Sequence, residues 1–354
     1  MLYQTENQHG GDVYGGGITL DFSANTNPLG TSPSVLEAVR RGLPQLHRYP
    51  DPYCRQLVQA IAAHEQVPAS YVLCGNGAAD LIYAYCAALR PRTAVELAPT
   101  FVEYGSGLAQ VGCRVDLYFL HQAQNFDLDE RFLSFLEEKK PEVVFLCTPN
   151  NPTGRLLPLP LLEQVLQGCA AWGARVFLDE CFLDLTEDGV SAKALLAAHP
   201  ELLILKAFTK SYGMAGIRLG YCLCADSALL HRMASASQPW NVSSLAQSAG
   251  VAALTEQGFL RKTRELIRTE RRWLTDNLTA LGFWVCPSQA NYLLFRGPRG
   301  LREGLLRQGI AIRGCENYSG LDDGWYRIAV RPHEENEALI TAIRQFCKEK
   351  SLWQ

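Results

Sequence analysis

The chain has 354 residues, of which 47% are hydrophobic and 19% are charged, and its formal net charge at neutral pH is -3. This is the composition of a globular protein long enough for one large core and a smaller second domain. No basic run or stripe is present, so nucleic acid is not expected as a partner. No apolar stretch approaches the roughly 18 residues of a membrane span, so no membrane partner is expected either.

The N-terminus and the cysteines bear on the compartment. The first residues, MLYQTENQHGG, lack the charged and apolar regions of a signal peptide. The 12 cysteines show neither a CxxC pair nor a His/Cys spacing typical of zinc. We therefore expect a cytoplasmic protein with buried free thiols and no metal site. Cys181 is the one thiol expected near a functional site, because it directly follows Asp179 and Glu180.

Residues 1–35 are rich in Gly, Asn and Pro and are predicted to form an irregular N-terminal arm that belongs to a small domain. Residues 36–260 then alternate between apolar strands and amphipathic helices. Strands are predicted at YVLCGNG, TAVELA, RVDLYFL, EVVFLCTP, ARVFLDE and LLILKAF, and helices at PYCRQLVQAIAAHEQ, ADLIYAYCAAL, EYGSGLAQVG and PLPLLEQVLQGCAAW. This alternation predicts a large α/β domain with a mainly parallel sheet flanked by helices.

The C-terminal part, residues 261–354, is predicted to be a small α+β domain. The segment EQGFLRKTRELIRTERRWLTDNLTAL is predicted to be one long amphipathic helix that joins the two domains. Strands follow at ANYLLF, IAIRG and WYRIAV, and helices at LREGLLRQG and HEENEALITAIRQFCKE. Ligands of such α/β proteins bind at the carboxyl ends of the parallel strands, and this is where the motifs below lie.

The segment LKAFTKSYGMAGIRLGY (205–221) places Thr209 and Lys210 after an apolar strand and Arg218 before Gly220. A lone lysine at a strand end is usually a solvated surface group. Here a hydroxyl and a guanidinium, both good phosphate ligands, flank it, and glycines allow a ligand to approach the backbone closely. The pattern is typical of a desolvated lysine that attaches covalently to pyridoxal 5'-phosphate (PLP).

Three further strand ends fit that cofactor. Asp179 ends a strand too apolar to face water, and a carboxylate there would keep the pyridine nitrogen of PLP protonated. Asn151, in the turn TPNNPTG, is placed to hydrogen-bond the cofactor's phenolic oxygen. Gly77, Ala78 and Ala79, at the start of a helix, would bind its phosphate through main-chain N–H groups. Each motif alone is ambiguous, since a loop acid, a turn and a glycine before a helix are all common.

The order of these motifs resembles the fold-type I PLP enzymes, the aspartate aminotransferase superfamily, over essentially the whole chain. LHRYP (46–50) and NNPTG are similar to the histidinol-phosphate aminotransferase branch. That resemblance implies a homodimer with shared active sites, in which Tyr49 reaches the cofactor phosphate of the partner subunit. It also implies that Phe101 stacks on the PLP ring.

A more specific resemblance is to the L-threonine-O-3-phosphate decarboxylases of cobalamin biosynthesis. It is carried by HGG, LDFSANTNPLG, RYPD, GNG, FVEYG, LCTPNNPTG, RLGY, QPWNVSSLAQ, ANYLL, IRGCENYSGLD and YRIAVR, in that order. The family implies decarboxylation of L-threonine O-3-phosphate to (R)-1-amino-2-propanol O-2-phosphate and CO2.

The same resemblance implies the substrate-binding residues. Those for the substrate phosphate are His9, Gly10 and Asn25, with Asn151 in support. Arg313 and Arg327 would be anion clamps, Arg327 for the α-carboxylate. Without the resemblance, each arginine would be taken for a surface residue.

Two departures and three alternatives stay open. Ala207 stands where many relatives have a serine, and Phe182 stands where aminotransferases usually have a tyrosine that donates to the phenolic oxygen. A histidinol-phosphate-type aminotransferase is the first alternative. The second is a decarboxylase that prefers L-serine O-phosphate, because the one methyl group that distinguishes the two substrates is worth only about 1–3 kcal/mol of binding free energy. A non-catalytic regulator with this fold is disfavoured, because neither an added DNA-binding domain nor a basic patch is found.

Overall fold

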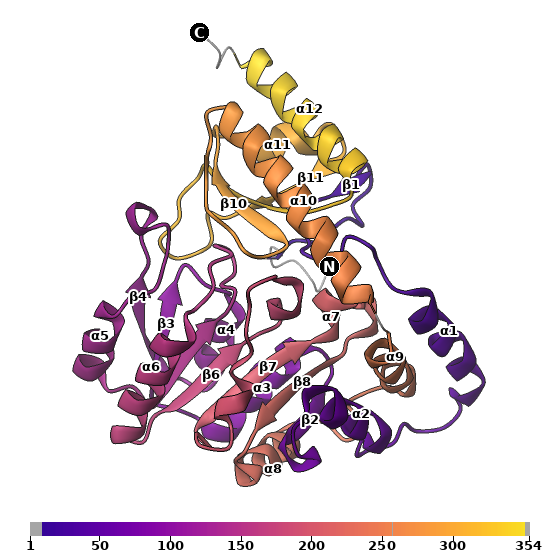
Figure 1. The fold of residues 1–354 in the computed structure, drawn as a ribbon, viewed down its shortest axis with the longest axis vertical. Helices are drawn as coiled ribbons and strands as arrows, with labels where there is room; N and C mark the ends of the chain where they lie inside the picture. Colours follow the sequence, from indigo (N-terminus) through magenta and orange to yellow (C-terminus); the bar gives the residue numbers. More distant parts are fainter. Residues whose placement is uncertain (1–8, 257, 351–354) are drawn as a thin grey trace.

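The computed structural model describes residues 9–256 and 258–350. Figure 1 shows a large sheet with its helices in the lower part and a small sheet beneath α11 and α12 in the upper part. The large sheet has seven strands in the order β2-β8-β7-β6-β5-β3-β4. Their bounds are β2 Val72–Gly75, β3 Thr93–Ala98, β4 Arg114–Phe119, β5 Val143–Cys147, β6 Arg175–Asp179, β7 Leu202–Ala207 and β8 Gly220–Cys224.

The direction of the strands decides where the motifs meet. Strands β3 to β7 are mutually parallel, whereas β8 runs antiparallel to both of its neighbours, β7 and β2. β2 therefore points the same way as β7, and the carboxyl ends of both lie at the amino end of β8. The register shows this directly, because Gly220 pairs with Gly75 on one side and with Ala207 on the other.

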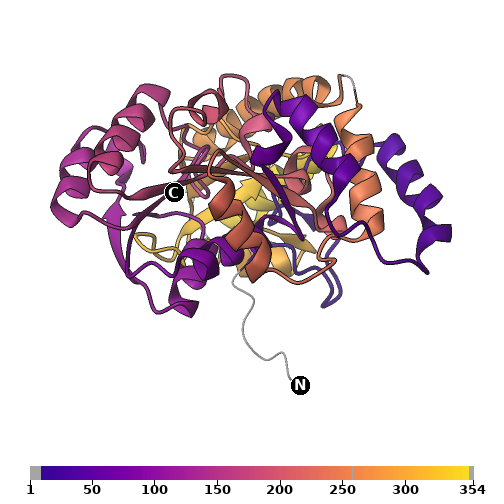
Figure 2. The same ribbon diagram turned by 90° about the horizontal axis from the view of Figure 1, so that it is seen from below.

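Helices cover both faces of the large sheet, as the perpendicular view in Figure 2 shows. They are α2 Arg55–Glu65, α3 Ala78–Leu89, α4 Glu103–Gln110, α5 Arg131–Lys139, α6 Leu159–Ala171, α8 Ser227–Ala236 and α9 Ser244–Leu254, while α1, Pro33–Gly42, packs on α9. Alternate residues of a strand belong to different cores. In β5, Val144 belongs to a cluster of buried side chains that includes residues of α2, α5 and α6, and Phe145 belongs to one that includes residues of α3, α4 and α8. The predicted α/β architecture with a mainly parallel sheet is confirmed.

The small sheet is antiparallel, in the order β12-β13-β10-β9. Its strands are β9 Trp284–Val285, β10 Tyr292–Arg296, β12 Arg313–Gly314 and β13 Trp325–Ala329, and its helices are α11 Leu301–Leu306 and α12 His333–Glu349. The long helix α10, Phe259–Ala280, leads into it with Ile267, Leu274 and Leu278 buried. This part agrees with the predicted α+β pattern, while the domain limits at residues 35 and 260 stay predictions.

Two local predictions need correction. The segment IAIRG was expected to be one strand, but it forms β11, Ile310–Ala311, and β12, which belong to different sheets. β11 pairs in parallel with β1, Leu20–Asp21, so the N-terminal arm is joined to the small sheet's side of the molecule. The strand β8 was not predicted, because its short apolar run directly follows a glycine-rich loop.

Candidate active site

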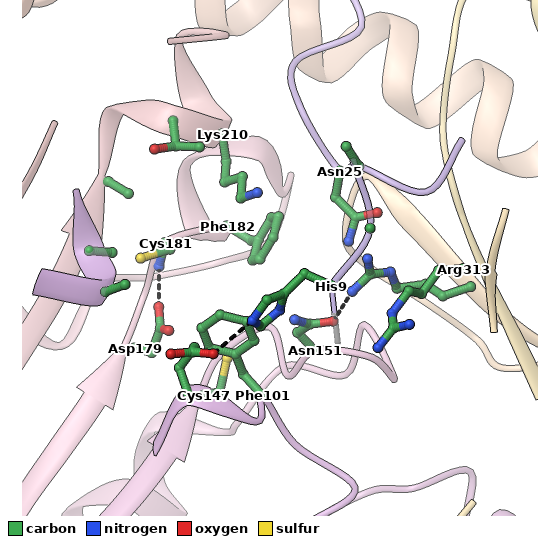
Figure 3. Close-up of a pocket in the computed structure, with 18 of the residues that line it drawn as sticks. His9, Asn25, Phe101, Cys147, Asn151, Asp179, Cys181, Phe182, Lys210 and Arg313 are labelled. Carbon is green, nitrogen blue, oxygen red and sulfur yellow. Dashed lines mark hydrogen bonds and ion pairs between the residues drawn. The ribbon is translucent and has the colours of Figure 1, made fainter. Parts of the chain in front are cut away.

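A cavity of about 440 Å³ opens at the carboxyl edge of the large sheet (Figure 3). Its size is in the range of small-molecule sites. Of the residues predicted from the sequence, the lining includes His9, Gly10, Asn25, Ala78, Ala79, Phe101, Asn151, Asp179, Phe182, Thr209, Lys210, Arg218, Arg313 and Arg327. The fold therefore gathers in one place side chains that lie more than 300 positions apart.

Lys210 lies in α7, Phe208–Ser211, a single helical turn that directly follows β7. Burial lowers the pKa of its amine to about 8, and the nearby charge of Arg327 acts in the same direction. The Nζ atom lies 5.5 Å from the centre of the Phe182 ring, so an apolar surface faces the amine. A lysine in this setting has a far larger neutral fraction near pH 8 than a solvated one, which is what a nucleophile requires.

The turn that carries Lys210 is fixed from two sides. The Ser211 hydroxyl donates to Asp184 Oδ2 at 3.1 Å, and the Ser211 carbonyl accepts from the Asn27 amide at 2.7 Å. Asn27 Nδ2 also donates to the Thr263 hydroxyl of α10 at 3.0 Å. The arm, α7 and α10 are thereby joined directly behind Lys210.

Asp179 faces the cavity, whereas Glu180 does not. Asp179 Oδ1 accepts from the Cys181 N–H at 2.8 Å, and Oδ2 accepts from the Tyr104 hydroxyl at 2.6 Å. Glu180 accepts from Ser191 Oγ at 2.6 Å and from the backbone N–H of residue 192 at 2.8 Å, on the other side. Burial raises the pKa of Asp179, so a cation placed against it, such as a protonated pyridine nitrogen, would be stabilising.

The start of α3 forms an anion cradle. Gly77 precedes the helix with φ +86, and the N–H groups of Ala78 and Ala79 lie in its first turn, where no helical acceptor exists. The Arg218 guanidinium lies against Gly77, so closely that a Cβ there would be 2.6 Å from Nη2. Thr209 adds a buried hydroxyl to the same lining. Gly77 itself is not in the lining, but only glycine leaves room for the arginine.

Arg313 and Arg327 are paired across neighbouring strands β12 and β13, and both are buried. Arg327 donates to the Asn151 side-chain oxygen and, at 2.9 Å, to the carbonyl of Ser23. Its Nε is buried and has no hydrogen-bond partner among the described residues. Buried guanidinium groups are costly unless an anion is nearby, so this arrangement fits an anionic ligand.

Tyr318 lies between the two arginines and was not predicted. Its hydroxyl accepts from Arg327 Nη1 at 3.4 Å, and its ring centre lies 5.6 Å from the Arg313 guanidinium. Arg313 also donates to Asn317 Oδ1 at 2.7 Å. The sequence did contain a signal, because both residues belong to the segment IRGCENYSGLD, in which only Arg313 was assigned a role.

Asn25 gives a further indication that a ligand binds. It is 2% exposed, and neither atom of its amide has a hydrogen-bond partner among the described residues. Buried polar side chains are normally hydrogen-bonded, and each exception requires an explanation. The amide lies in the cavity lining (Figure 3), so a bound polar group would supply the missing partners.

At the cavity mouth, His9 Nε2 lies 2.7 Å from Glu103 Oε1, and the His9 ring lies 5.9 Å from that of Phe101. Gly10 rests on Ser23: a Cβ on Gly10 would be 2.2 Å from the Ser23 carbonyl oxygen. The HGG motif thus has a physical reason. Glu103 and Ser23 also line the cavity and were not predicted, although they lie in the quoted segments FVEYG and LDFSANTNPLG.

Tyr49 is not in the cavity. Its side chain is 79% exposed and stacks on Trp240 with 4.6 Å between ring centres. Its role in a partner subunit's site stays a prediction. The free thiol of Cys181 lines the cavity as anticipated, and so does that of Cys147.

The residues present fit PLP. Lys210 supplies a buried amine for its aldehyde, Asp179 a carboxylate for its ring nitrogen, and the start of α3 with Arg218 a cradle for its phosphate. Phe101 supplies an aromatic face. Within the described ranges, no cluster of three or more potential metal ligands was found, and no helix is long and apolar enough to cross a membrane.

Comparison with known proteins gives the following matches. The model of the family described as aminotransferase class I and II matches residues 18–343. The threonine-phosphate decarboxylase of Salmonella typhimurium is 40% identical, over 92% of this chain and 90% of that protein. The histidinol-phosphate aminotransferase of Geobacillus sp. is 35% identical, over 96% of this chain and 93% of that protein.

Two solved structures are also similar. The histidinol-phosphate aminotransferase from Clostridium acetobutylicum has a TM-score of 0.87 and 27% identity, over 93% of this chain and 99% of that chain. The L-threonine-O-3-phosphate decarboxylase from Porphyromonas gingivalis has a TM-score of 0.80 and 25% identity, with the same coverage of 93% and 99%. Both kinds of relative therefore match nearly the whole length.

Proposed function

Because this chain belongs to the class I and II aminotransferase family of PLP-dependent enzymes, we propose that it decarboxylates L-threonine O-3-phosphate. The products would be (R)-1-amino-2-propanol O-2-phosphate and CO2, and the reaction would serve cobalamin biosynthesis. Family membership confirms the fold-type I architecture and the PLP cofactor predicted from the sequence. The choice of decarboxylation is supported by the 40% identity to the Salmonella enzyme of that name.

The observation that carries the proposal is the pair of buried arginines opposite Lys210. Arg313 and Arg327 are 7% and 6% exposed and line the same cavity as the lysine. A substrate with both a carboxylate and a phosphate matches two buried cationic groups in one cavity. We assign the α-carboxylate to Arg327 and the phosphate to Arg313, with His9, Gly10, Asn25 and Asn151 around it.

These residues can also direct the reaction. When bound, PLP supplies an electron sink for the bond that stands perpendicular to its ring. Arg327 and Arg313 would hold the two anions of the substrate and so fix the rotation about Cα, with the bond to the carboxylate perpendicular. Loss of CO2 would leave the electron pair of that bond to the cofactor's electron sink, and a proton delivered to Cα would complete the reaction.

Lys210 and Asp179 have separate tasks in this scheme. Lys210, with its pKa lowered to about 8, can hold the proton and deliver it to Cα. Asp179, fixed by the Tyr104 hydroxyl, keeps the ring nitrogen protonated. Phe182 has no hydroxyl to donate to the phenolic oxygen, so Asn151 would serve that oxygen alone.

The proposal includes a cytoplasmic homodimer with shared active sites. The homodimer is supported by a group of exposed large hydrophobic side chains, among which Leu46 is 58%, Tyr53 69% and Trp240 47% exposed. Tyr49 stacks on Trp240 in this group and would reach the partner subunit's cofactor phosphate. Light scattering should give the mass of a dimer. Tyr49→Phe should weaken PLP binding while the protein remains a dimer.

The reaction type is tested by incubating PLP-loaded enzyme with L-threonine O-3-phosphate and quantifying CO2, the phosphorylated amine and pyridoxamine phosphate. We expect one CO2 per amine. Pyridoxamine phosphate without CO2 would establish the histidinol-phosphate-type aminotransferase alternative instead. L-serine O-phosphate in the same assay should show kcat/KM at least about tenfold lower, because one methyl contact is lost.

A further inference from the structure

The N-terminal arm is anchored at the cavity mouth by one acidic side chain. Glu103, in the first turn of α4, lines the cavity, and its Oε1 lies 2.7 Å from His9 Nε2. The hydroxyl of Tyr83, in α3, donates to Glu103 Oε2 at 2.7 Å. Both carboxylate oxygens are therefore engaged, one by the arm and one by the large sheet's helices.

The chemistry of this contact fixes the direction of the hydrogen bond. The hydrogen bond from His9 lowers the pKa of Glu103, and the one from Tyr83 adds to this, while partial burial opposes both. Glu103 is therefore ionised at neutral pH and can only accept. It follows that His9 Nε2 donates this hydrogen bond, so the contact with Glu103 holds the imidazole ring at the cavity mouth.

The arm is held at a second point close by. The Gly11 N–H donates to Ser23 Oγ at 2.8 Å, and the Ser23 carbonyl accepts from Arg327 Nη2 at 2.9 Å. His9 thus lies at the end of a short segment with two anchors. One is Ser23 beside the buried arginine, and the other is Glu103 on α4.

The presence of an acid in this cavity requires a reason. The lining also contains Lys210, Arg313 and Arg327, and an unpaired carboxylate among them would repel a phosphorylated ligand. We propose that Glu103, fixed by Tyr83, is a positioning residue that holds the His9 imidazole over the cavity so that it contacts the substrate phosphate. This inference rests on the proposed function, because it deepens the assignment of His9.

A double-mutant cycle tests whether Glu103 acts through His9. Glu103→Ala should raise KM for L-threonine O-3-phosphate about tenfold and leave kcat within about twofold, as expected for loss of one charge-assisted contact. His9→Ala should have the same effect. The double variant should have the same KM as either single variant, because each substitution removes the same contact between His9 and the substrate phosphate. Additive effects would overturn the proposal.

Conservative variants separate position from general stability. Glu103→Gln retains an oxygen that can accept from His9 and should recover most of the KM lost in Glu103→Ala. Tyr83→Phe leaves Glu103 and His9 in place but removes the hydroxyl that donates to Glu103, so it should raise KM less than Glu103→Ala does. Glu138→Gln, an exposed acid paired with Lys139 on α5, is the matched control and should change nothing.

Calorimetry with inorganic phosphate on the PLP-loaded protein gives a readout independent of turnover. The dissociation constant should rise about tenfold in Glu103→Ala and in His9→Ala. Equal phosphate affinity in wild type and Glu103→Ala would refute the inference even if the enzyme decarboxylates threonine phosphate. A wild type that binds phosphate through this pair but releases no CO2 would instead refute the proposed function.

Discussion

At the scale of single residues, Lys210 combines a buried amine with a pKa lowered to about 8 and a position directly after β7. Lys210→Ala should abolish covalent attachment of PLP and reduce kcat by at least about 100-fold, the lower end for loss of a positioned acid–base group. Attachment is measured by mass spectrometry after borohydride reduction. A reduced PLP adduct on Lys210→Ala, or full decarboxylation by it, would disprove the assignment.

Tyr318 was not predicted from the sequence, but in the structure it contacts both arginines of the cavity. Its hydroxyl accepts from Arg327, so its own proton can be donated to an anion held between the two arginines. Tyr318→Phe should raise KM for the phosphorylated substrate about three- to tenfold, with folding unchanged. The matched control is Tyr326→Phe, whose hydroxyl donates to the Pro298 carbonyl outside the cavity. If both variants have the same KM as wild type, Tyr318 is only a packing residue.

At the scale of elements, the N-terminal arm requires a glycine at position 10, where it contacts Ser23 closely. A Cβ on Gly10 would lie 2.2 Å from the Ser23 carbonyl oxygen, the same oxygen that holds Arg327. Gly10→Ala should therefore displace Ser23 or the arm and lower kcat/KM about tenfold or more. Gly15→Ala is the control, because a Cβ there meets nothing within 4 Å. Equal kinetics in the two variants would show that the arm tolerates the shift.

The sequence predicted the elements that carry strong periodicity and apolar runs. β3 was predicted at its observed limits, Thr93–Ala98, and the strands that end at Cys147, Asp179 and Ala207 were all placed correctly. Because parallel strands end at one edge, the PLP-binding motifs could be brought together without coordinates. Local pattern does not encode partner choice, so the division of IAIRG between two sheets and the reversed β8 required the structure.

The candidate site divides in the same way. Residues with a fixed chemical task toward PLP, such as Lys210 and Asp179, were predicted because several motifs, each ambiguous alone, occur together at strand ends, and both residues line the cavity. Glu103 and Tyr318 were not, because a glutamate at a helix start and a tyrosine in a loop have many ordinary explanations. Only their contacts with His9 and Arg327 reveal them.

At the scale of the whole molecule, a buried ionic cluster lies behind the strand that leads to Lys210. Lys206 Nζ lies 3.0 Å from both Glu65 Oε1 and Asp184 Oδ1, and the Tyr221 hydroxyl donates to Glu65 at 2.5 Å. The cluster joins α2, β7 and β8 to Asp184, whose other carboxylate oxygen accepts from the Ser211 hydroxyl of α7. Burying these charges is unfavourable unless all are paired, so loss of one member should affect the global stability of the fold.

This cluster makes a pH-dependent prediction for Glu65. Burial opposes ionisation, but the charge of Lys206 and the hydrogen bond from Tyr221 prevail and lower the pKa of Glu65 from 4.5 to about 2. The unfolded chain takes up this proton near pH 4.5 and the folded one near pH 2, so the stabilisation is complete above pH 4.5 and is lost as the pH falls toward 2. Glu65→Gln should cost about 3 kcal/mol of unfolding free energy at pH 7, as for a broken buried pair. In urea titrations the difference in unfolding free energy between wild type and Glu65→Gln should become smaller from pH 4.5 to pH 3. The exposed control Glu37→Gln should differ little from wild type in unfolding free energy at either pH. A gap at pH 3 as large as at pH 7 would show that packing, not the charge of Glu65, sets its contribution.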